Sequence, residues 1–124
     1  MKSSPCIKNQ PLERHVVIVA GEESGDRHAA HLVAQLKTLH PNMHFSGIGG
    51  KHMQQQGVSL IDNLAEHGVT GVVEVLRHFN VIRRAFKTIQ NHLLQQKPDL
   101  LILIDYPGFN LRLAKFAKQL MVQP

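Results

Sequence analysis

Cysteine and large aromatic side chains are scarce in this sequence. Its 124 residues include one cysteine, one tyrosine and no tryptophan. Cys6 has no second cysteine to pair with, so an intramolecular disulfide is excluded and a reducing compartment is expected. Aromatic residues make up 5% of the chain and do not alternate with basic residues as in a base-stacking surface. We therefore expect no nucleic acid partner.

Long apolar runs are also lacking, and acidic side chains are outnumbered. No apolar run reaches the roughly 18 residues of a membrane-spanning helix. No apolar segment follows Lys2, so we expect no secretory signal. The chain has 14 lysines and arginines against 9 aspartates and glutamates, a net charge of +5. This balance favours anionic partners, such as phosphate esters or an anionic membrane, without choosing among them.

What the chain does contain is a regular alternation of strand and helix patterns. Short apolar runs predict strands at His15–Ala20, His44–Ile48, Val58–Ile61 and Leu100–Ile104. Apolar spacings of three and four predict helices at Gly25–Leu39, Lys51–Gln56 and Val72–Gln96, and a last helix from about Asn110. Strands that alternate with helices form parallel sheets. The expected fold is therefore α/β, a Rossmann-like parallel sheet with flanking helices.

Composition also divides the chain. Residues 1–14 are mostly polar, carry two prolines and are expected to form a flexible tail. Residues 15–124 are expected to form one partial Rossmann-like domain, because the alternation stops after a helix, where a further strand would follow. Leu100–Ile104 is the most apolar of the predicted strands, and we expect it to be the most buried.

The first candidate site is the turn Gly21-Glu22-Glu23-Ser24-Gly25-Asp26, which joins the first strand to the first helix. Ligands of open α/β sheets bind where strands end and helices begin, and helix N-termini favour anions. Three carboxylates and no lysine argue against a phosphate cradle and suit sugar hydroxyls, which donate hydrogen bonds to carboxylates. An equal alternative is that Ser24 or Asp26 only caps the helix.

Two further stretches follow predicted strands. Asp105 ends the Leu100–Ile104 strand, where a carboxylate can act as a general base, although a turn-forming or capping role is as strong. The stretch Gly47–Lys51 only partly matches a dinucleotide fingerprint, because His52 occupies the place of its last glycine. A tight turn that needs glycine is favoured there.

The long helix predicted at Val72–Gln96 carries basic residues beside an apolar stripe. Arg83, Arg84 and Lys87 accompany Phe79, Ile82 and Phe86. An apolar stripe that faces the core is favoured over one that faces an anionic membrane. The nine histidines are dispersed. The pairs His28/His31 and His40/His44 have spacings that metal ligands can adopt, but no H-E-x-x-H motif or Cys/His cluster accompanies them, so we expect surface histidines and no metal site.

Five sequence blocks occur in a family-specific order: Val19–Asp26, Gly47–Gly50 with Met53, Gly71–Leu76, Lys97–Asp99 and Ile104–Leu111. In combination they resemble the N-terminal part of lipid-A-disaccharide synthases, which are bacterial glycosyltransferases. The resemblance covers about residues 16–120. It implies a GT-B architecture, two Rossmann-like domains facing a cleft, of which this chain would form a truncated N-terminal domain.

The resemblance also implies an activity. Such enzymes transfer 2,3-diacylglucosamine from UDP-2,3-diacylglucosamine to 2,3-diacylglucosamine 1-phosphate, with inversion and without a metal or another cofactor. They act in the cytoplasm, at the surface of the anionic inner membrane. The donor lies mostly on the C-terminal GT-B domain, so we expect the 124-residue chain alone to be inactive. An uncovered sheet edge leaves dimerisation or a domain swap open.

Residue roles follow from the same resemblance. Asp105 matches the catalytic base that takes the proton of the acceptor's 6-hydroxyl, and Glu22 and Ser24 match turn residues implicated in activity. The expected substrate-binding residues are Gly21, Gly25, Asp26, Gly49, Gly50, Glu74 and Asn110. The residues expected to contact membrane or acyl chains are Val75, Leu76, Phe79, Ile82, Arg83, Arg84 and Phe86. Two positions depart from the family pattern, which commonly has aspartate at Gly108 and methionine at Thr70.

Two alternatives stay open on the sequence alone. The chain could be half of another GT-B enzyme or of a sugar-nucleotide epimerase. It could also be a non-enzymatic Rossmann-like module that binds a phosphorylated ligand at the Gly21–Asp26 turn.

Overall fold

A computed structural model describes residues 13–62 and 71–122, with side chains described for residues 13–62 and 79–120. Within these described residues, eight elements follow one another. They are β1 (Arg14–Ala20), α2 (Glu23–Leu39), β2 (Met43–Ile48), α3 (Lys51–Gln55), β3 (Ser59–Asp62), α4 (Gly71–Gln96), β4 (Leu100–Ile104) and α5 (Pro107–Val122). The strands and helices alternate as the apolar spacing predicts. The predicted tail lies almost wholly outside the described residues.

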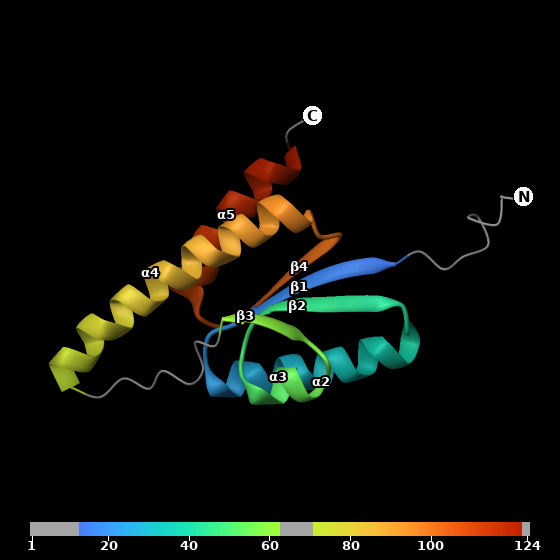
Figure 1. Cartoon of the computed structure of the whole chain (residues 1–124), viewed down its shortest axis with the longest axis horizontal. Coiled ribbons are helices and arrows are strands. Elements are labelled where there is room, and N and C mark those ends of the chain that lie inside the picture. Colours follow the sequence, from blue (N-terminus) through green and yellow to red (C-terminus); the bar gives the residue numbers. More distant parts are fainter. Residues whose placement is uncertain (1–12, 63–70, 123–124) are drawn as a thin grey trace, which may run out of the picture.

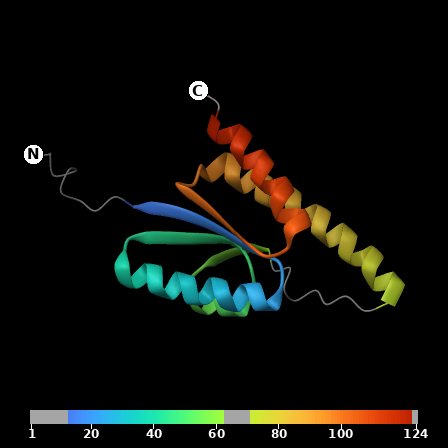
Figure 2. The same cartoon turned by 180° about the vertical axis from the view of Figure 1, so that it is seen from behind.

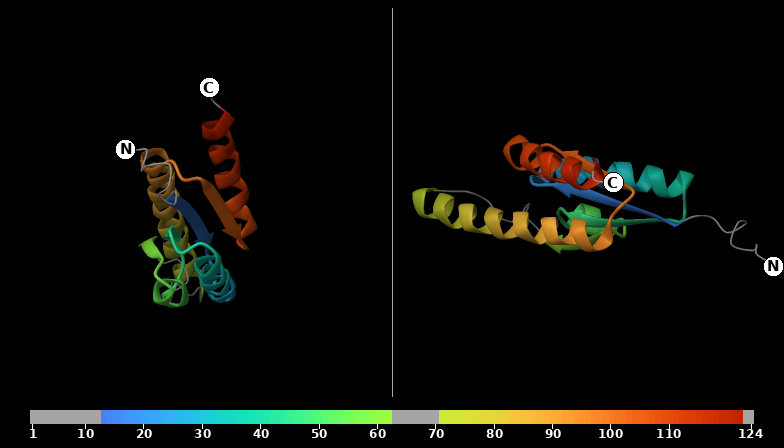
Figure 3. Two further views of the ribbon diagram at one scale, coloured as in Figure 1. Left: turned by 90° about the vertical axis from the view of Figure 1, so that its right-hand side faces the viewer. Right: turned by 90° about the horizontal axis from the view of Figure 1, so that it is seen from above.

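All strand pairs of the sheet are parallel, and the strand order is β3-β2-β1-β4. Helices α2 and α3 cover one face, and α4 and α5 cover the other (Figures 1 and 2). Seen from above, α4 and α5 lie side by side over the sheet (Figure 3). This arrangement confirms the predicted Rossmann-like α/β fold, whose strand order reverses between β1 and β4.

The core consists of two layers, one on each face of β1. Successive side chains of a strand point to opposite faces, so Val17 and Val19 join the layer under α4 and α5, whereas Val16 and Ile18 face α2. The first layer also holds Ile48, Ala85, Ile89, Leu93, Phe109, Leu113 and Ala117. The second also holds Ala20, Ala29, Val33, Phe45, Met53 and Val58. β1, with helices on both sides, is the central buried strand.

The prediction that Leu100–Ile104 is the most buried strand is wrong. β4 lies at the edge of the sheet, its first residue Leu100 is 48% exposed, and the remaining four residues are half-buried. Apolar content alone does not report a strand's place in the sheet, because the crossover connections decide the order of strands.

Two helix starts also differ from the predictions. Helix α2 begins at Glu23, two residues before the predicted Gly25, and α5 begins at Pro107, well before Asn110. Proline suits the first turn of a helix because its missing N–H would have no partner there and its φ is already helical. Pro107 therefore starts α5 instead of extending the turn that follows β4.

Three of the described histidines, His15, His52 and His92, are half-buried and not the surface residues that we expected. His15 of β1 and His92 of α4 are half-buried, and the Nε2 atom of each lies 2.7 Å from Ser46 Oγ. Burial lowers the pKa of both imidazoles; the charge of His44 lowers that of His15 further, and Asp99 partly opposes this. The serine therefore joins the last turns of α4 to the sheet.

Candidate functional site

The candidate site lies at the carboxyl ends of β1 and β4, where the strand order reverses. The two strands pair in a register that sets Ala20 opposite Ile104. The turn that begins at Gly21 therefore lies beside the turn formed by Asp105 and Tyr106. The fold thus brings together the two stretches that the sequence singled out, at the position where open α/β sheets bind ligands.

Two glycines allow these turns to approach closely. A methyl group added at Gly21 would lie 2.6 Å from ring carbons of Tyr106, closer than real side-chain atoms approach. A methyl group added at Gly25 would lie 3.4 Å from Asp105 Oδ2, an ordinary contact. The Asp105 carboxylate thus lies against the first turn of α2, and the Tyr106 ring lies over Gly21.

Asp105 and Tyr106 both have φ 55°, in the left-handed region that non-glycine residues seldom adopt. Asn110 holds this conformation from the first turns of α5. Its buried Nδ2 donates hydrogen bonds to the carbonyls of Asp105 and, at 3.3 Å, of Ile104. Strained residues of this kind cluster at functional sites. Asn110 therefore braces the turn, and its expected contact with substrate stays a prediction.

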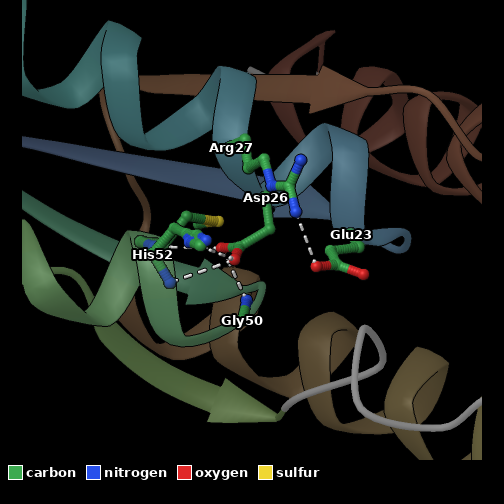
Figure 4. A network of polar contacts seen from close by, with 6 residues as sticks. Glu23, Asp26, Arg27, Gly50 and His52 are labelled. Atoms are coloured by element: carbon green, nitrogen blue, oxygen red, sulfur yellow. Dashed lines mark hydrogen bonds and ion pairs between the residues drawn. The ribbon is translucent and has the colours of Figure 1, made fainter.

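The alternative that Ser24 or Asp26 caps α2 is wrong. Glu22 is the N-cap residue, and in the described part of the chain no side chain, neither that of Ser24 nor that of Asp26, caps α2. Asp26 is 2% exposed and instead accepts hydrogen bonds from the backbone N–H groups of Gly50 (2.8 Å), His52 (3.0 Å) and Met53 (2.9 Å). Figure 4 shows its carboxylate pointing from α2 to the start of α3.

Asp26 therefore supplies the acceptors that the unpaired N–H groups of a helix start require, across 24 or more residues of sequence. Gly49 and Gly50 are buried beside it, and a methyl group at Gly49 would lie 2.0 Å from Met53 Sδ. The favoured interpretation of this stretch, a turn that needs positive φ, is wrong: the positive φ of 147° falls at Gly47 inside β2, and the turn glycines Gly49 and Gly50 do not have positive φ. Substrate contacts for Asp26, Gly49 and Gly50 stay predictions.

The polar side chains around the turn are either paired with another side chain or exposed to solvent. Glu23 is paired with Arg27 at 2.9 Å on the surface of α2 (Figure 4). Glu22, Ser24 and Asp105 are exposed. Burial raises the pKa of the Tyr106 phenol, and the negative charge of Glu22 raises it further. The phenol therefore stays protonated at neutral pH, and sequence reasoning did not select it although it adjoins Asp105.

The residues expected to contact membrane or acyl chains lie partly in a groove between α4 and α5. Phe79, Ile82, Arg83 and Phe86 line it, whereas Arg84 is exposed and not part of the lining. The side chains of Glu74, Val75 and Leu76 lie outside the described residues. Sequence reasoning missed Arg112 of α5, which lines the same groove and lies 29 residues from Arg83 in the sequence.

Comparison with known proteins identifies the family. A family model described as lipid-A-disaccharide synthetase matches residues 16–124. The chain belongs to this family. It is 58% identical over 109 residues to lipid-A-disaccharide synthase 1 of Legionella pneumophila (strain Lens), covering 88% of this chain and 28% of that protein. This membership decides against another GT-B family and against a sugar-nucleotide epimerase.

Other lipid-A-disaccharide synthases are similar. The chain is 49% identical over 106 residues to the synthase of Geobacter metallireducens and 45% identical over 106 residues to that of Coxiella burnetii (strain Dugway 5J108-111), in both cases over 86% of this chain and 28% of the relative. The chain therefore spans little more than a quarter of the length of these curated relatives.

Of the two positions that depart from the family pattern, the structure describes only Gly108. Gly108 is exposed in the first turn of α5 and lines the groove, and no described atom lies within 4 Å of a methyl group added there. The place of the usual family aspartate is therefore open space. Thr70 lies outside the described residues.

Proposed function

We propose that, in an enzyme of this family, this chain forms the acceptor side of the active site and carries the general base. The reaction transfers 2,3-diacylglucosamine from UDP-2,3-diacylglucosamine to 2,3-diacylglucosamine 1-phosphate. The observation that carries the proposal is Asp105, an exposed carboxylate held in a strained turn at the point where the strand order reverses. The family to which the chain belongs supports the substrates.

Asp105 accepts the proton of the acceptor's 6-hydroxyl as that oxygen attacks the anomeric carbon of the donor. The bond from the anomeric carbon to the UDP phosphate oxygen breaks at the same time, and its electron pair leaves with UDP. Attack from the face opposite UDP inverts the anomeric centre and gives a β-1,6 linkage. The products are the disaccharide 1-phosphate, UDP and a protonated Asp105.

Glu22 and Ser24 hold the sugar in this account. Both are exposed at the turn beside Asp105, and both can accept hydrogen bonds from sugar hydroxyls. Gly21 contributes by leaving room, since it lets the Tyr106 ring lie against the backbone of this turn. Together these residues orient the acceptor so that its 6-hydroxyl faces the Asp105 carboxylate.

The membrane is the second partner in the proposal. The first turns of α4 extend beyond the sheet (Figures 1 and 3), and Phe79 is 59% exposed on this helix. Arg83 and Arg84 are exposed nearby and suit anionic lipid headgroups. None of the described helices is long and apolar enough to span a bilayer. We place the protein as a peripheral enzyme on the cytoplasmic face of the inner membrane.

Substitution of this sequence for the aligned segment of the Legionella pneumophila relative tests the proposal. The resulting chimera should release UDP from UDP-2,3-diacylglucosamine only when 2,3-diacylglucosamine 1-phosphate is present. The unmodified relative and a folded chimera, checked by circular dichroism, serve as references. A folded chimera that releases no UDP, or that uses a donor without acyl chains equally well, would contradict the proposed reaction.

A further inference from the structure

The groove between α4 and the start of α5 has an aromatic floor beside the Asp105 turn. Its volume is about 630 Å³, within the range of small-molecule sites. The rings of Phe86 and Phe109 meet edge to face with centroids 5.2 Å apart, and the Tyr106 and Phe109 centroids lie 5.8 Å apart. Phe79 and Ile82 extend this apolar surface along α4.

Three cationic side chains line the same groove. Arg83 and Lys87 come from α4 and Arg112 comes from α5, so positive charge stands on both walls. Among the described residues, none of these three side chains forms an ion pair. The basic partners in the ion pairs of the structure are Arg14, Arg27, His44 and His52. No aspartate or glutamate is among the lining residues. The groove therefore joins apolar surface to positive charge that no described carboxylate balances.

We propose that this groove binds a single phosphorylated lipid, with an acyl chain on the aromatic floor and the phosphate between Arg83, Lys87 and Arg112. The inference rests on the proposed function, in which the acceptor carries both acyl chains and a 1-phosphate. Tyr106 lines the groove and directly follows Asp105. A lipid seated there has its sugar next to the catalytic carboxylate.

The groove is a hollow between two helices, and this favours one lipid molecule over a flat membrane surface. An acyl chain that enters it covers Phe79, which is 59% exposed, and the exposed part of Phe86, and this stabilises binding in proportion to the area covered. Phosphate oxygens suit guanidinium groups, which donate two parallel hydrogen bonds. A single amphiphilic anion can therefore contact both the apolar and the cationic side chains of the groove.

Gly108 lies in the lining of the groove, at the position where the family pattern commonly has an aspartate. It is exposed in the lining, and a side chain there would meet no described atom within 4 Å. An aspartate would therefore fit without displacing its neighbours, one turn before Arg112 on α5 and in the same lining as Arg83 and Lys87 of α4. Gly108 thus offers a substitution that changes the charge of the lining without creating a clash.

Tyrosine fluorescence of the 124-residue chain reports on the groove directly, because Tyr106 is the only tyrosine and the chain has no tryptophan. The probe is dodecyl phosphate below its micelle concentration. We expect a saturable change in emission. The affinity should be about two- to fivefold lower in Gly108→Asp and Arg112→Glu, as for lost or opposed partly exposed ion pairs. The matched control Gly108→Ala should show no loss. Dodecyl maltoside, which has the same chain and no charge, should bind at least fivefold more weakly.

The proposal is overturned if monomeric dodecyl phosphate gives no saturable change, or if Gly108→Asp binds it as well as Gly108→Ala. A change seen only with anionic phosphatidylglycerol vesicles would show a membrane-facing surface and would also overturn it. Circular dichroism of both variants separates lost binding from lost folding. Failure of the chimera to release UDP, with dodecyl phosphate still bound, would contradict the proposed reaction and not the groove.

Discussion

Asp26 illustrates how residues of one short turn divide between holding the fold and facing a ligand. Its buried carboxylate accepts three backbone hydrogen bonds from the start of α3, whereas Glu22 and Asp105 remain exposed. Only the exposed acids can meet a substrate without breaking internal hydrogen bonds. The acidic character of the turn therefore serves two purposes that the sequence alone does not separate.

Replacement of Asp26 by asparagine should destabilise the fold. The amide offers one acceptor oxygen and would set an N–H donor against a backbone N–H, so the free energy of unfolding should fall by about 1–3 kcal/mol. Urea denaturation of the chain, followed by circular dichroism, measures this change. Glu23→Gln, which removes an exposed carboxylate three residues away, should cost no more than about 0.5 kcal/mol. Equal stabilities of the two variants would contradict the capping role.

At the residue scale, the sequence predicts where the site lies better than what each residue does. Both Gly21–Asp26 and Asp105 follow parallel strands, so their meeting at one edge could be predicted. The Asp26 contacts could not, because its partners Gly50 and Met53 lie in a separate helix and no periodic pattern links them. The left-handed conformation of Asp105 is equally hidden, since it depends on Asn110 after the chain has turned.

At the element scale, α4 has two different halves. Towards its C-terminus Ile89 and Leu93 are buried in the core, and His92 reaches Ser46 of β2. Phe79, three turns earlier, is largely exposed, and there the helix extends past the sheet. The apolar spacing predicts the whole helix within one residue of its ends. It does not predict how far the sheet reaches beneath it.

The His15–Ser46–His92 contact should make stability depend on pH. Burial lowers the folded-state pKa of both histidines below the usual 6.5. Between the two pKa values the unfolded chain therefore binds more protons than the folded chain. The stabilising contribution present above about pH 6.5 should be lost as pH falls through the lower folded-state pKa values. His92→Gln should reduce the loss of unfolding free energy between pH 8 and pH 5.5, measured by urea denaturation. The exposed His31→Gln should leave it unchanged. Persistence of the full pH dependence in His92→Gln would show that the contact does not cause it.

At the scale of the whole molecule, the parallel order β3-β2-β1-β4 places all candidate catalytic residues at one end of the sheet. The alternation of strands and helices could be predicted, and so could this class of sheet. The edge position of β4 could not, because its apolar residues resemble those of a central strand. The basic residues are also divided by the fold, with Arg83 and Arg84 on α4 and Lys51 on the opposite layer.

This division predicts which charges bind a membrane. Reversal of both Arg83 and Arg84 to glutamate should weaken binding to anionic vesicles at least tenfold, since each basic residue near such a surface contributes about 1 kcal/mol. Flotation with phosphatidylglycerol vesicles measures the binding. Lys51→Glu, on the other face of the sheet, should change it little. Unchanged flotation of the double variant would count against an electrostatic role for α4.

The rate of transfer by Asp105→Asn shows whether Asp105 is the general base of the reaction. Measured as acceptor-dependent UDP release in the chimera with the Legionella pneumophila relative, kcat should fall about 10²- to 10⁴-fold, the usual contribution of a general base, with little change in the KM for acceptor. Glu23→Gln, a nearby exposed carboxylate paired with Arg27, should retain full activity. An Asp105→Asn enzyme with kcat within tenfold of the unsubstituted chimera would contradict the account.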